Sequence, residues 1–191
     1  MNKRDLILYV HGWNSHANAR KAQLIEHELK NHEIFDTASL TLKNHPKEAI
    51  KQLTEFILEK QSKYNVHLVG SSLGGYYSVF LAETLNLKAA MINPAVWAYK
   101  IFENDRGDVE NLNTGEKYFI DQAWIDSLED IFIENPTPDR YLVLLQTGDE
   151  TLDYKYAEKY FSGARIVIDE GGSHSFDGLE QKIPQILLHF S

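Results

Sequence analysis

The chain has 191 residues, of which 43% are hydrophobic and 25% charged, a composition typical of one globular domain with a sizeable core. Its formal net charge of −9 argues against a nucleic-acid partner, and the absence of cysteine excludes a disulfide, a thiolate metal site and a cysteine nucleophile. The apolar run at residues 6–10 is too short for a signal-peptide core, and no run approaches membrane-spanning length. We therefore expect a cytoplasmic protein without a membrane partner.

Apolar segments alternate with amphipathic ones along most of the chain. The expected strands span residues 6–10, 35–42, 66–69, 88–92, 141–146 and 165–168. The expected helices span residues 17–30, 46–60, 73–85, 152–161 and 179–190, the last interrupted by Pro184. The first strand is a continuous apolar run, which is typical of a strand covered on both faces. This alternation predicts an α/β fold, with a mostly parallel sheet and helices on both of its faces.

The alternation fails between residues 96 and 138. This stretch contains glycines, asparagines and acids, together with several aromatic residues, among them Trp97, Tyr99 and Trp124. It is too long for a plain connection and too aromatic for a disordered linker. We interpret it as a small cap or lid, at about residues 96–138, within a single domain that covers residues 1–191.

A short motif follows the third expected strand. Gly70, Ser72 and Gly74 form the pattern G-x-S-x-G, which is typical of a nucleophile elbow, a strained strand-to-helix turn that exposes a serine hydroxyl. Small residues are needed on both sides because the turn is tight. The glycines alone would also permit such a turn with an idle Ser72. A phosphate-binding loop is disfavoured, because no lysine follows the glycines and the pattern G-x-G-x-x-G is absent.

Further polar residues follow the ends of other expected strands, and in a parallel sheet these ends meet at one crevice. Asp149 follows the fifth strand and His174 the sixth, which gives the chain order Ser, Asp, His expected with an elbow. His174 would take the proton of Ser72, and Asp149 would orient the imidazole. Glu150 remains an alternative acid, whereas Asp153 is expected to begin a helix.

A tetrahedral intermediate requires two hydrogen-bond donors for its oxyanion. We expect these to be the backbone N–H groups of Leu73, directly after the nucleophile, and of Trp13, with Asn14 as the alternative. No pair of histidines has the spacing of a helical metal site, so no metal is expected. Four residues are predicted to line the substrate pocket: Asn14, Tyr76, Asn93 and Trp97. The last three are equally compatible with core or cap packing.

Taken together, these motifs resemble the YqiA-type esterases of the α/β-hydrolase superfamily. The resemblance extends over essentially the whole chain and is weakest at residues 97–135. It implies a compact α/β-hydrolase without the usual N-terminal antiparallel strands, and six strands in the order 2-1-3-4-5-6. The motifs that carry it are residues 11–15, 70–77, 93–95, 146–150, 152–154 and 170–174.

The resemblance also implies hydrolysis of carboxylic esters, mostly with short acyl chains, by a triad of Ser72, Asp149 and His174. The expected partner is a small-molecule ester, no cofactor is needed, and the oligomeric state stays open. A thioesterase or acyltransferase with the same triad is an alternative, because an acyl-enzyme can transfer its acyl group to other acceptors. A hydrolase-fold protein that binds a ligand without turnover is another.

Overall fold

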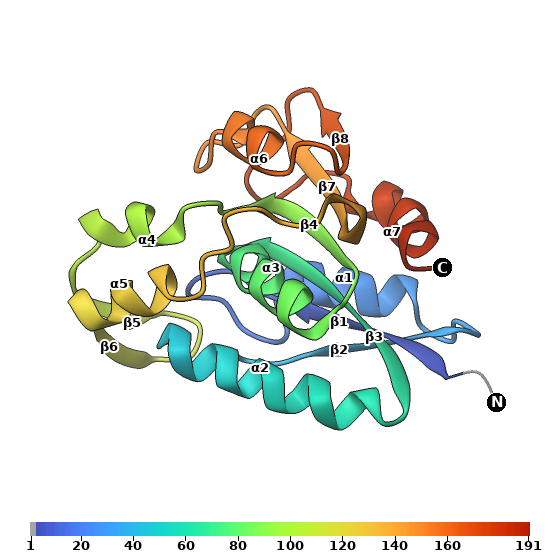
Figure 1. The fold of residues 1–191 in the computed structure, drawn as a ribbon, viewed down its shortest axis with the longest axis horizontal. Helices are drawn as coiled ribbons and strands as arrows, with labels where there is room; N and C mark the ends of the chain where they lie inside the picture. Colours follow the sequence, from blue (N-terminus) through green and yellow to red (C-terminus); the bar gives the residue numbers. More distant parts are fainter. Residues whose placement is uncertain (1–2) are drawn as a thin grey trace.

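Six parallel strands form the central sheet of the computed structural model, which describes residues 3–191 (Figure 1). Their order is β2-β1-β3-β4-β7-β8, and a separate antiparallel hairpin contains β5 and β6. Because the hairpin strands are not part of the sheet, this order confirms the predicted 2-1-3-4-5-6. The sheet strands are β1 (Arg4–Val10), β2 (Phe35–Ser39), β3 (Tyr64–Ser72), β4 (Ala89–Pro94), β7 (Tyr141–Gln146) and β8 (Arg165–Asp169).

Helices cover both faces of the sheet, because successive side chains of a strand point to opposite faces. In β1, Leu6 and Leu8 pack with one hydrophobic cluster, and Ile7 and Tyr9 pack with the other. The first cluster includes residues of α2 (Pro46–Gln61), α3 (Leu73–Leu85) and α6 (Tyr154–Tyr160). The second includes residues of α1 (Arg20–Glu28), the 3₁₀ helix η3 (Leu179–Lys182) and α7 (Ile183–Phe190).

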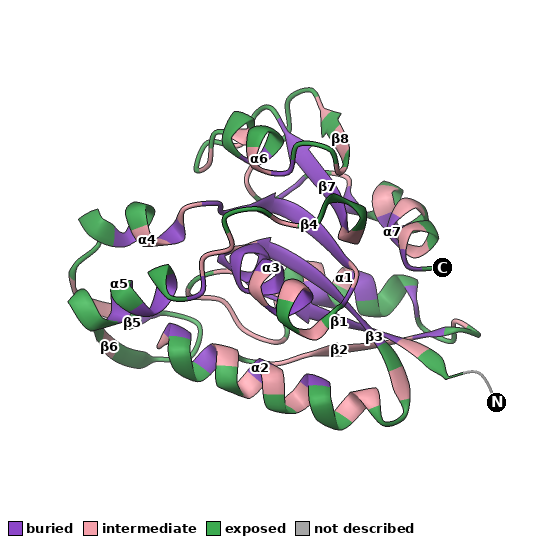
Figure 2. Cartoon of the chain, viewed as in Figure 1, coloured by how far each residue is buried: buried purple, intermediate pink, exposed green. Residues whose placement is uncertain are grey.

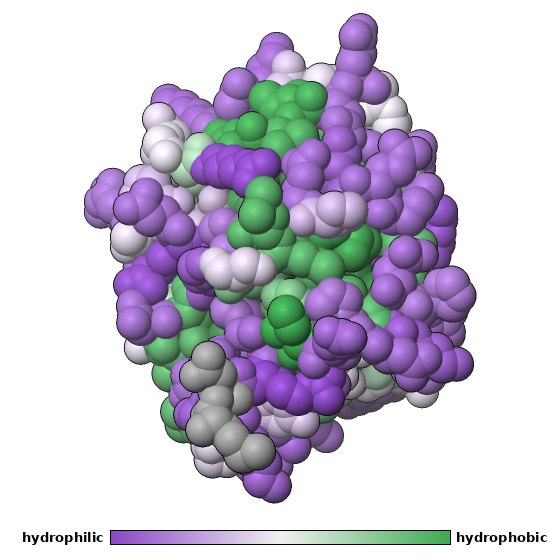
Figure 3. Space-filling model, turned by 90° about the vertical axis from the view of Figure 1, so that its right-hand side faces the viewer, coloured by the Kyte–Doolittle hydropathy of each residue, from purple (hydrophilic) through white to green (hydrophobic). Residues whose placement is uncertain are grey.

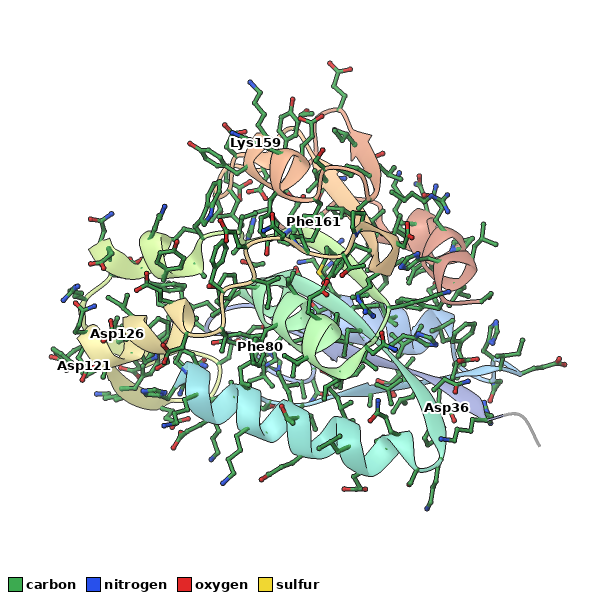
Figure 4. The ribbon with its side chains drawn as sticks, viewed as in Figure 1. Asp36, Phe80, Asp121, Asp126, Lys159 and Phe161 are labelled. Carbon is green, nitrogen blue, oxygen red and sulfur yellow. The ribbon has the colours of Figure 1, made fainter. Side chains whose placement is uncertain are left out.

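The inner strands are the most deeply buried part of the molecule, as the purple colour of β4 and β7 shows (Figure 2). The edge strands β2 and β8 are only partly buried. Phe161, just after α6, extends the core above β7 and is 2% exposed (Figure 4). The sheet is therefore rigid at its centre, where β3 delivers Ser72, and more exposed at the edge strand that leads to His174.

Several expected boundaries differ from the structure by one to three residues, and two of the differences have a plain physical reason. β2 ends at Ser39 rather than at residue 42, because its partner β1 ends at Val10 and the pairing stops at Tyr9 with Ser39. The helix expected over residues 179–190 is divided into η3 and α7, and Pro184 lies in the first turn of α7. That position suits proline, because the first-turn N–H groups have no intrahelical acceptor.

Residues 96–138, here called the cap segment, lie beyond the carboxyl ends of β1, β3 and β4 (Figure 1). The indole N–H of Trp124 donates to the Asn44 carbonyl at 3.0 Å, and the Tyr76 hydroxyl donates to the Leu128 carbonyl at 2.7 Å. Asp121 caps the helix that carries Trp124 (Figure 4). The segment contains α4 (Ala98–Ile101), the 3₁₀ helix η1 (Phe102–Asn104), β5 (Gly107–Asn111), β6 (Glu116–Ile120) and α5 (Gln122–Glu129), and the 3₁₀ helix η2 (Pro138–Arg140) begins at its last residue.

The opposite side of the molecule, near the C-terminal helix α7, shows a mainly hydrophilic surface with hydrophobic side chains between the polar ones (Figure 3). Among residues 3–191, no helix combines the length and the apolar character that a membrane span requires. The polar residues that follow the strands all lie at the other end, beside the cap segment.

Candidate active site

Ser72 lies at the junction of β3 and α3 in a strained backbone conformation, with φ 54° and ψ −124°. Positive φ is costly for a residue with a side chain and is found where the surrounding structure enforces it. Two glycines make the turn possible by close approach. A Cβ atom at Gly70 would lie 2.6 Å from the Gly74 carbonyl oxygen, and one at Gly74 would lie 2.5 Å from the His11 carbonyl oxygen. The turn therefore presents the Ser72 hydroxyl at the carboxyl edge of the sheet.

The imidazole of His174 lies between Ser72 and Asp149. Its Nε2 atom is 3.1 Å from Ser72 Oγ, and its Nδ1 atom is 2.8 Å from Asp149 Oδ2. These three side chains come from residues 72, 149 and 174, and they meet because β3, β7 and β8 end at the same edge of the sheet. With the proton on Nδ1, Nε2 is free to accept the proton of the serine hydroxyl.

The carboxylate of Asp149 is held in place as an anion. Its side chain is 2% exposed, and Oδ1 accepts hydrogen bonds of 2.8 Å from the backbone N–H groups of Thr151 and Leu152. Burial raises the pKa of Asp149, but the hydrogen bonds from His174, Leu152 and Thr151 outweigh burial and lower it below its ordinary value. Glu150, the alternative acid, instead accepts the backbone N–H of His174 at 3.0 Å.

The loop that carries His174 is fixed from behind by two buried amide side chains. Asn93 Nδ2 donates to the Ser173 carbonyl at 3.0 Å, and Asn93 Oδ1 accepts the Gln146 backbone N–H, also at 3.0 Å. Gln146 Oε1 accepts the backbone N–H groups of Ser173 and Asp177 at 3.1 and 2.9 Å. Asn93 was predicted as a pocket wall, but the structure buries it at 2% exposure behind the loop, where it positions the histidine.

The loop after β1 lies directly against the nucleophile. A Cβ atom at Gly12 would lie 3.1 Å from Ser72 Cβ, so this glycine allows the closest approach of the loop. Among the hydrogen bonds that loops and turns form within residues 3–191, none is donated by the backbone N–H of Trp13 or of Leu73. Asn14, with φ 51°, turns the chain after Trp13. The loop thus brings Trp13, one of the two predicted oxyanion donors, to the cavity that contains Ser72.

The same loop is bonded to the cap segment. The Tyr118 hydroxyl accepts a hydrogen bond from Trp13 Nε1 at 2.5 Å and donates one to Asn14 Oδ1 at 2.8 Å. The Trp13 ring also meets Phe102 edge to face, with 5.0 Å between centroids. Asn14, predicted as a pocket residue, therefore joins the loop to the hairpin of β5 and β6.

Two cavities lie near the triad, and they share the wall residue Thr151. The one of about 430 Å³ is lined by Gly12, Trp13, Ser72 and His174. The smaller one, of about 280 Å³, does not include Ser72 in its wall; it is mostly apolar, and Trp97 lines it.

The remaining predicted pocket residue and a larger cavity lie elsewhere. Tyr76 is 4% exposed and lines neither of these two cavities, and its hydroxyl is bonded to the cap segment. The larger cavity, of about 950 Å³, lies beside β2 around Arg4, Phe35 and Asp36 and is lined by none of the residues of the triad. We place the site at Ser72 because the geometry of reactive groups, rather than cavity size, determines what chemistry is possible.

Three features of the site were missed by the sequence reasoning. The positioning role of Gln146 had one signal, a polar residue at the end of an otherwise apolar strand. Tyr118 had none, because its partners lie 105 and 104 residues away. Arg20 and Lys21, which line the cavity of about 430 Å³, lie in the helix expected over residues 17–30, and charges on such a helix are typical of a solvent-exposed face.

A family model described as "Uncharacterised protein family (UPF0227)" matches residues 6–191. The chain belongs to this family. The UPF0227 protein YcfP of Salmonella gallinarum is 25% identical over 186 residues, which cover 95% of this chain and 96% of the relative. UPF0227 is thus the family to which the resemblance to YqiA-type esterases pointed, and that prediction is confirmed.

Solved structures with the same architecture place this UPF0227 chain in the α/β-hydrolase fold, as predicted. Est1E from Butyrivibrio proteoclasticus, in a structure with ferulic acid bound, has a TM-score of 0.78 at 16% identity, covering 98% of this chain and 90% of Est1E. Mouse alpha/beta hydrolase domain-containing protein 10 has a TM-score of 0.72 at 20% identity, covering 100% and 93%. A monoacylglycerol lipase from Paleococcus ferrophilus has a TM-score of 0.70 at 17% identity, covering 100% and 98%.

Proposed function

We propose that this UPF0227 protein is a serine esterase that hydrolyses carboxylic esters, with a preference for short acyl chains. The observation that carries the proposal is the continuous set of contacts from Ser72 Oγ to His174 Nε2 at 3.1 Å and from His174 Nδ1 to Asp149 Oδ2 at 2.8 Å. A hydroxyl at neutral pH is a weak nucleophile, and an adjacent imidazole that accepts its proton activates it.

In the proposed reaction, Ser72 Oγ attacks the ester carbonyl carbon while His174 Nε2 accepts the hydroxyl proton. Asp149 stabilises the imidazolium that forms. The tetrahedral oxyanion accepts hydrogen bonds from the N–H groups of Trp13 and Leu73. When the bond from carbon to the leaving oxygen breaks, His174 donates the proton to the leaving alcohol, and the acyl group stays on Ser72.

Water completes the proposed cycle. His174 Nε2 accepts a proton from a water molecule as its oxygen attacks the acyl carbon, and then returns that proton to Ser72 Oγ as the acid leaves. Similarity to a lipase and to Est1E supports this chemistry at the level of fold. The mostly apolar cavity of about 280 Å³, which shares Thr151 with the cavity at Ser72, has room for a short hydrocarbon chain.

Stopped-flow measurement with p-nitrophenyl acetate tests the proposal. We expect a burst of p-nitrophenol that is stoichiometric with enzyme, followed by slower turnover, and we expect both phases to be lost in Ser72→Ala. Ser78→Ala is the matched control, since this nearby serine is fully buried and its hydroxyl is bonded to the Gly74 carbonyl at 2.7 Å. Equal turnover by the wild type and Ser72→Ala would exclude the mechanism.

A fluorophosphonate probe and a competing thioester separate the esterase from its alternatives. An esterase should be labelled covalently at Ser72, whereas a protein that only binds ligands would leave the serine unlabelled. To distinguish an esterase from a thioesterase, acyl-CoA is supplied together with a methyl ester of the same acyl chain. A kcat/KM larger for the thioester than for the ester would make the protein a thioesterase.

A further inference from the structure

The cavity in front of Ser72 has a positively charged wall. Arg20 and Lys21, in the first turn of α1, both line it, and no aspartate or glutamate does. The chain as a whole has the opposite balance, with 28 acidic and 19 basic residues. Acids outnumber bases over the molecule, yet only bases reach this cavity.

Neither cation is neutralised within the described residues 3–191. No carboxylate lies within ion-pair distance of Lys21 Nζ or of the Arg20 guanidinium. The carboxylate that acts electrostatically on Lys21 is that of Asp149, which is already bonded to His174. Both basic side chains are therefore available to a molecule in the cavity.

Lys21 is only partly exposed, so its charge is costly without a partner. Burial and the neighbouring Arg20 lower the pKa of its ammonium group, and Asp149 acts in the opposite direction. An anion bound in the cavity would replace the solvation that burial removes. The planar guanidinium of Arg20 and the compact ammonium of Lys21 are both suited to bind carboxylate or phosphate oxygens.

The second cavity has a different character and provides a contrast. Val96, Trp97, Ile101 and Leu152 line it, and Thr151 borders both cavities. Its wall also contains one cation and one anion, Lys100 and Asp153, whereas the cavity at Ser72 has two cations and no anion. The second cavity is therefore mostly apolar and balanced in charge, and the cavity at Ser72 is cationic. A neutral hydrocarbon ester would use only the apolar one.

We propose that the substrate is an anionic ester, in which the part that occupies the cavity of about 430 Å³ bears a carboxylate or phosphate group bound by Arg20 and Lys21. This inference rests on the proposed esterase function and specifies its substrate class. The two cations determine specificity and take no part in proton transfer. They favour an anionic ester over a neutral ester of the same shape.

Matched pairs of esters that differ in one charge test this proposal. The first pair, 4-acetoxybenzoate and methyl 4-acetoxybenzoate, places the charge on the leaving group. The second pair, monomethyl adipate and methyl hexanoate, places it on the acyl group. 4-Acetoxyphenyl phosphate replaces the carboxylate by phosphate. The measured quantity is the kcat/KM of the anionic ester divided by that of its neutral partner, in the wild type and in variants.

We expect Lys21→Gln to lower this ratio at least fivefold for one of the pairs, and the double variant with Arg20→Gln to lower it further. Comparing ratios removes differences in intrinsic ester reactivity and any general loss of activity in the variant. Lys30→Gln is the matched control, since Lys30 is exposed and lines only the remote cavity beside β2, and it should leave the ratio within twofold. Raised ionic strength should lower the wild-type ratio, because salt screens the attraction.

The outcomes separate this inference from the proposed function. If the wild type hydrolyses neutral esters and Lys21→Gln leaves both ratios unchanged, the cationic wall has no role and the esterase stands. If no ester is hydrolysed, the proposed function fails, and calorimetry with adipate then decides whether the anion site exists. Adipate should bind to Ser72→Ala and bind at least fivefold more weakly when Lys21→Gln is added; equal binding by the two proteins would overturn the inference.

Discussion

The side-chain amide of Asn93 donates a hydrogen bond of 3.0 Å to the carbonyl of Ser173, the residue that directly precedes His174. This bond joins β4, an inner strand of the sheet, to the loop after the edge strand β8. The histidine loop is thus attached to the rigid centre of the molecule and not only to its flanking strand. The position of the imidazole relative to Ser72 depends on this attachment.

Asn93→Ala should therefore lower kcat by about 10- to 100-fold, because a displacement of about 1 Å at a catalytic group can reduce the rate to this extent. It also leaves the Gln146 N–H without its acceptor, which costs about 1–3 kcal/mol of stability. The measurements are kcat, KM and the rate of fluorophosphonate labelling, with urea unfolding for stability. KM should change less than kcat, because the substrate cavities are not formed by Asn93.

Asn65→Ala is the control for this variant, since it removes a side-chain hydrogen bond to Asp5 at the other end of the sheet. Its labelling rate should equal that of the wild type. If Asn93→Ala were labelled as fast as the wild type, Asn93 would have no positioning role.

Asp149→Asn should reduce kcat by about 10³-fold or more, because a neutral amide no longer fixes the proton on His174 Nδ1 or stabilises the imidazolium. Glu150→Gln retains an oxygen that can accept the His174 backbone N–H, so its loss should stay below fivefold. Steady-state kinetics with p-nitrophenyl acetate compares the two. A larger effect at residue 150 than at residue 149 would assign the triad acid to Glu150.

Tyr118→Phe should lower kcat/KM about three- to tenfold. The substitution removes the hydroxyl that bonds Trp13 Nε1 and Asn14 Oδ1, so the loop that supplies one oxyanion donor is less fixed. Tyr64→Phe is a suitable control, because Tyr64 lies at the start of β3, beside the cavities remote from Ser72. Unchanged kinetics in Tyr118→Phe would show that the loop keeps its geometry without the cap segment.

Glu83 should contribute to stability in a pH-dependent manner. Its carboxylate accepts hydrogen bonds from the Thr137 N–H at 2.7 Å, the Thr137 hydroxyl at 2.8 Å and the Tyr141 hydroxyl at 2.6 Å. Burial raises the pKa of Glu83, but these bonds and the nearby Arg140 outweigh it and lower the pKa below its ordinary value of 4.5. A lowered folded-state pKa stabilises the protein above the unfolded-state value, and this contribution is lost as the pH falls through the folded-state pKa.

Urea unfolding at pH 7 and at pH 3 checks this linkage. Glu83→Gln should be clearly less stable than the wild type at pH 7, and the difference should shrink at pH 3. Gln retains an acceptor for the hydroxyl donors, so the comparison isolates the charge. A difference that is the same at both pH values would assign the effect to packing.

The fold and the contacts of the triad followed from local patterns. Alternation of apolar and amphipathic segments predicted the sheet, and the ends of parallel strands meet at one edge whatever their separation in sequence. This is why Ser72, Asp149 and His174 could be selected without coordinates. The strained turn also leaves a local signature, since Gly70 and Gly74 have no room for a Cβ atom.

The supporting contacts could not be predicted in the same way. Asn93 and Tyr118 act through partners that are brought near by the packing of other elements, and nothing in their own sequence neighbourhood specifies those partners. Arg20 and Lys21 belong to a helix whose charged residues are expected to face solvent, and only the structure shows that they also line the cavity at Ser72. The end of β2 likewise depends on where β1 stops.

The location of β8 at the margin of the sheet has a consequence for inactivation by heat. This strand has one hydrogen-bonded neighbour, β7, whereas β3 is paired on both sides. Marginal strands open at lower free-energy cost than central ones, so we expect β8 to open on warming before most of the interior does, which leaves few attachments for the imidazole beyond the Asn93 bond to Ser173. Catalysis then fails at a lower temperature than the cooperative melting of the domain.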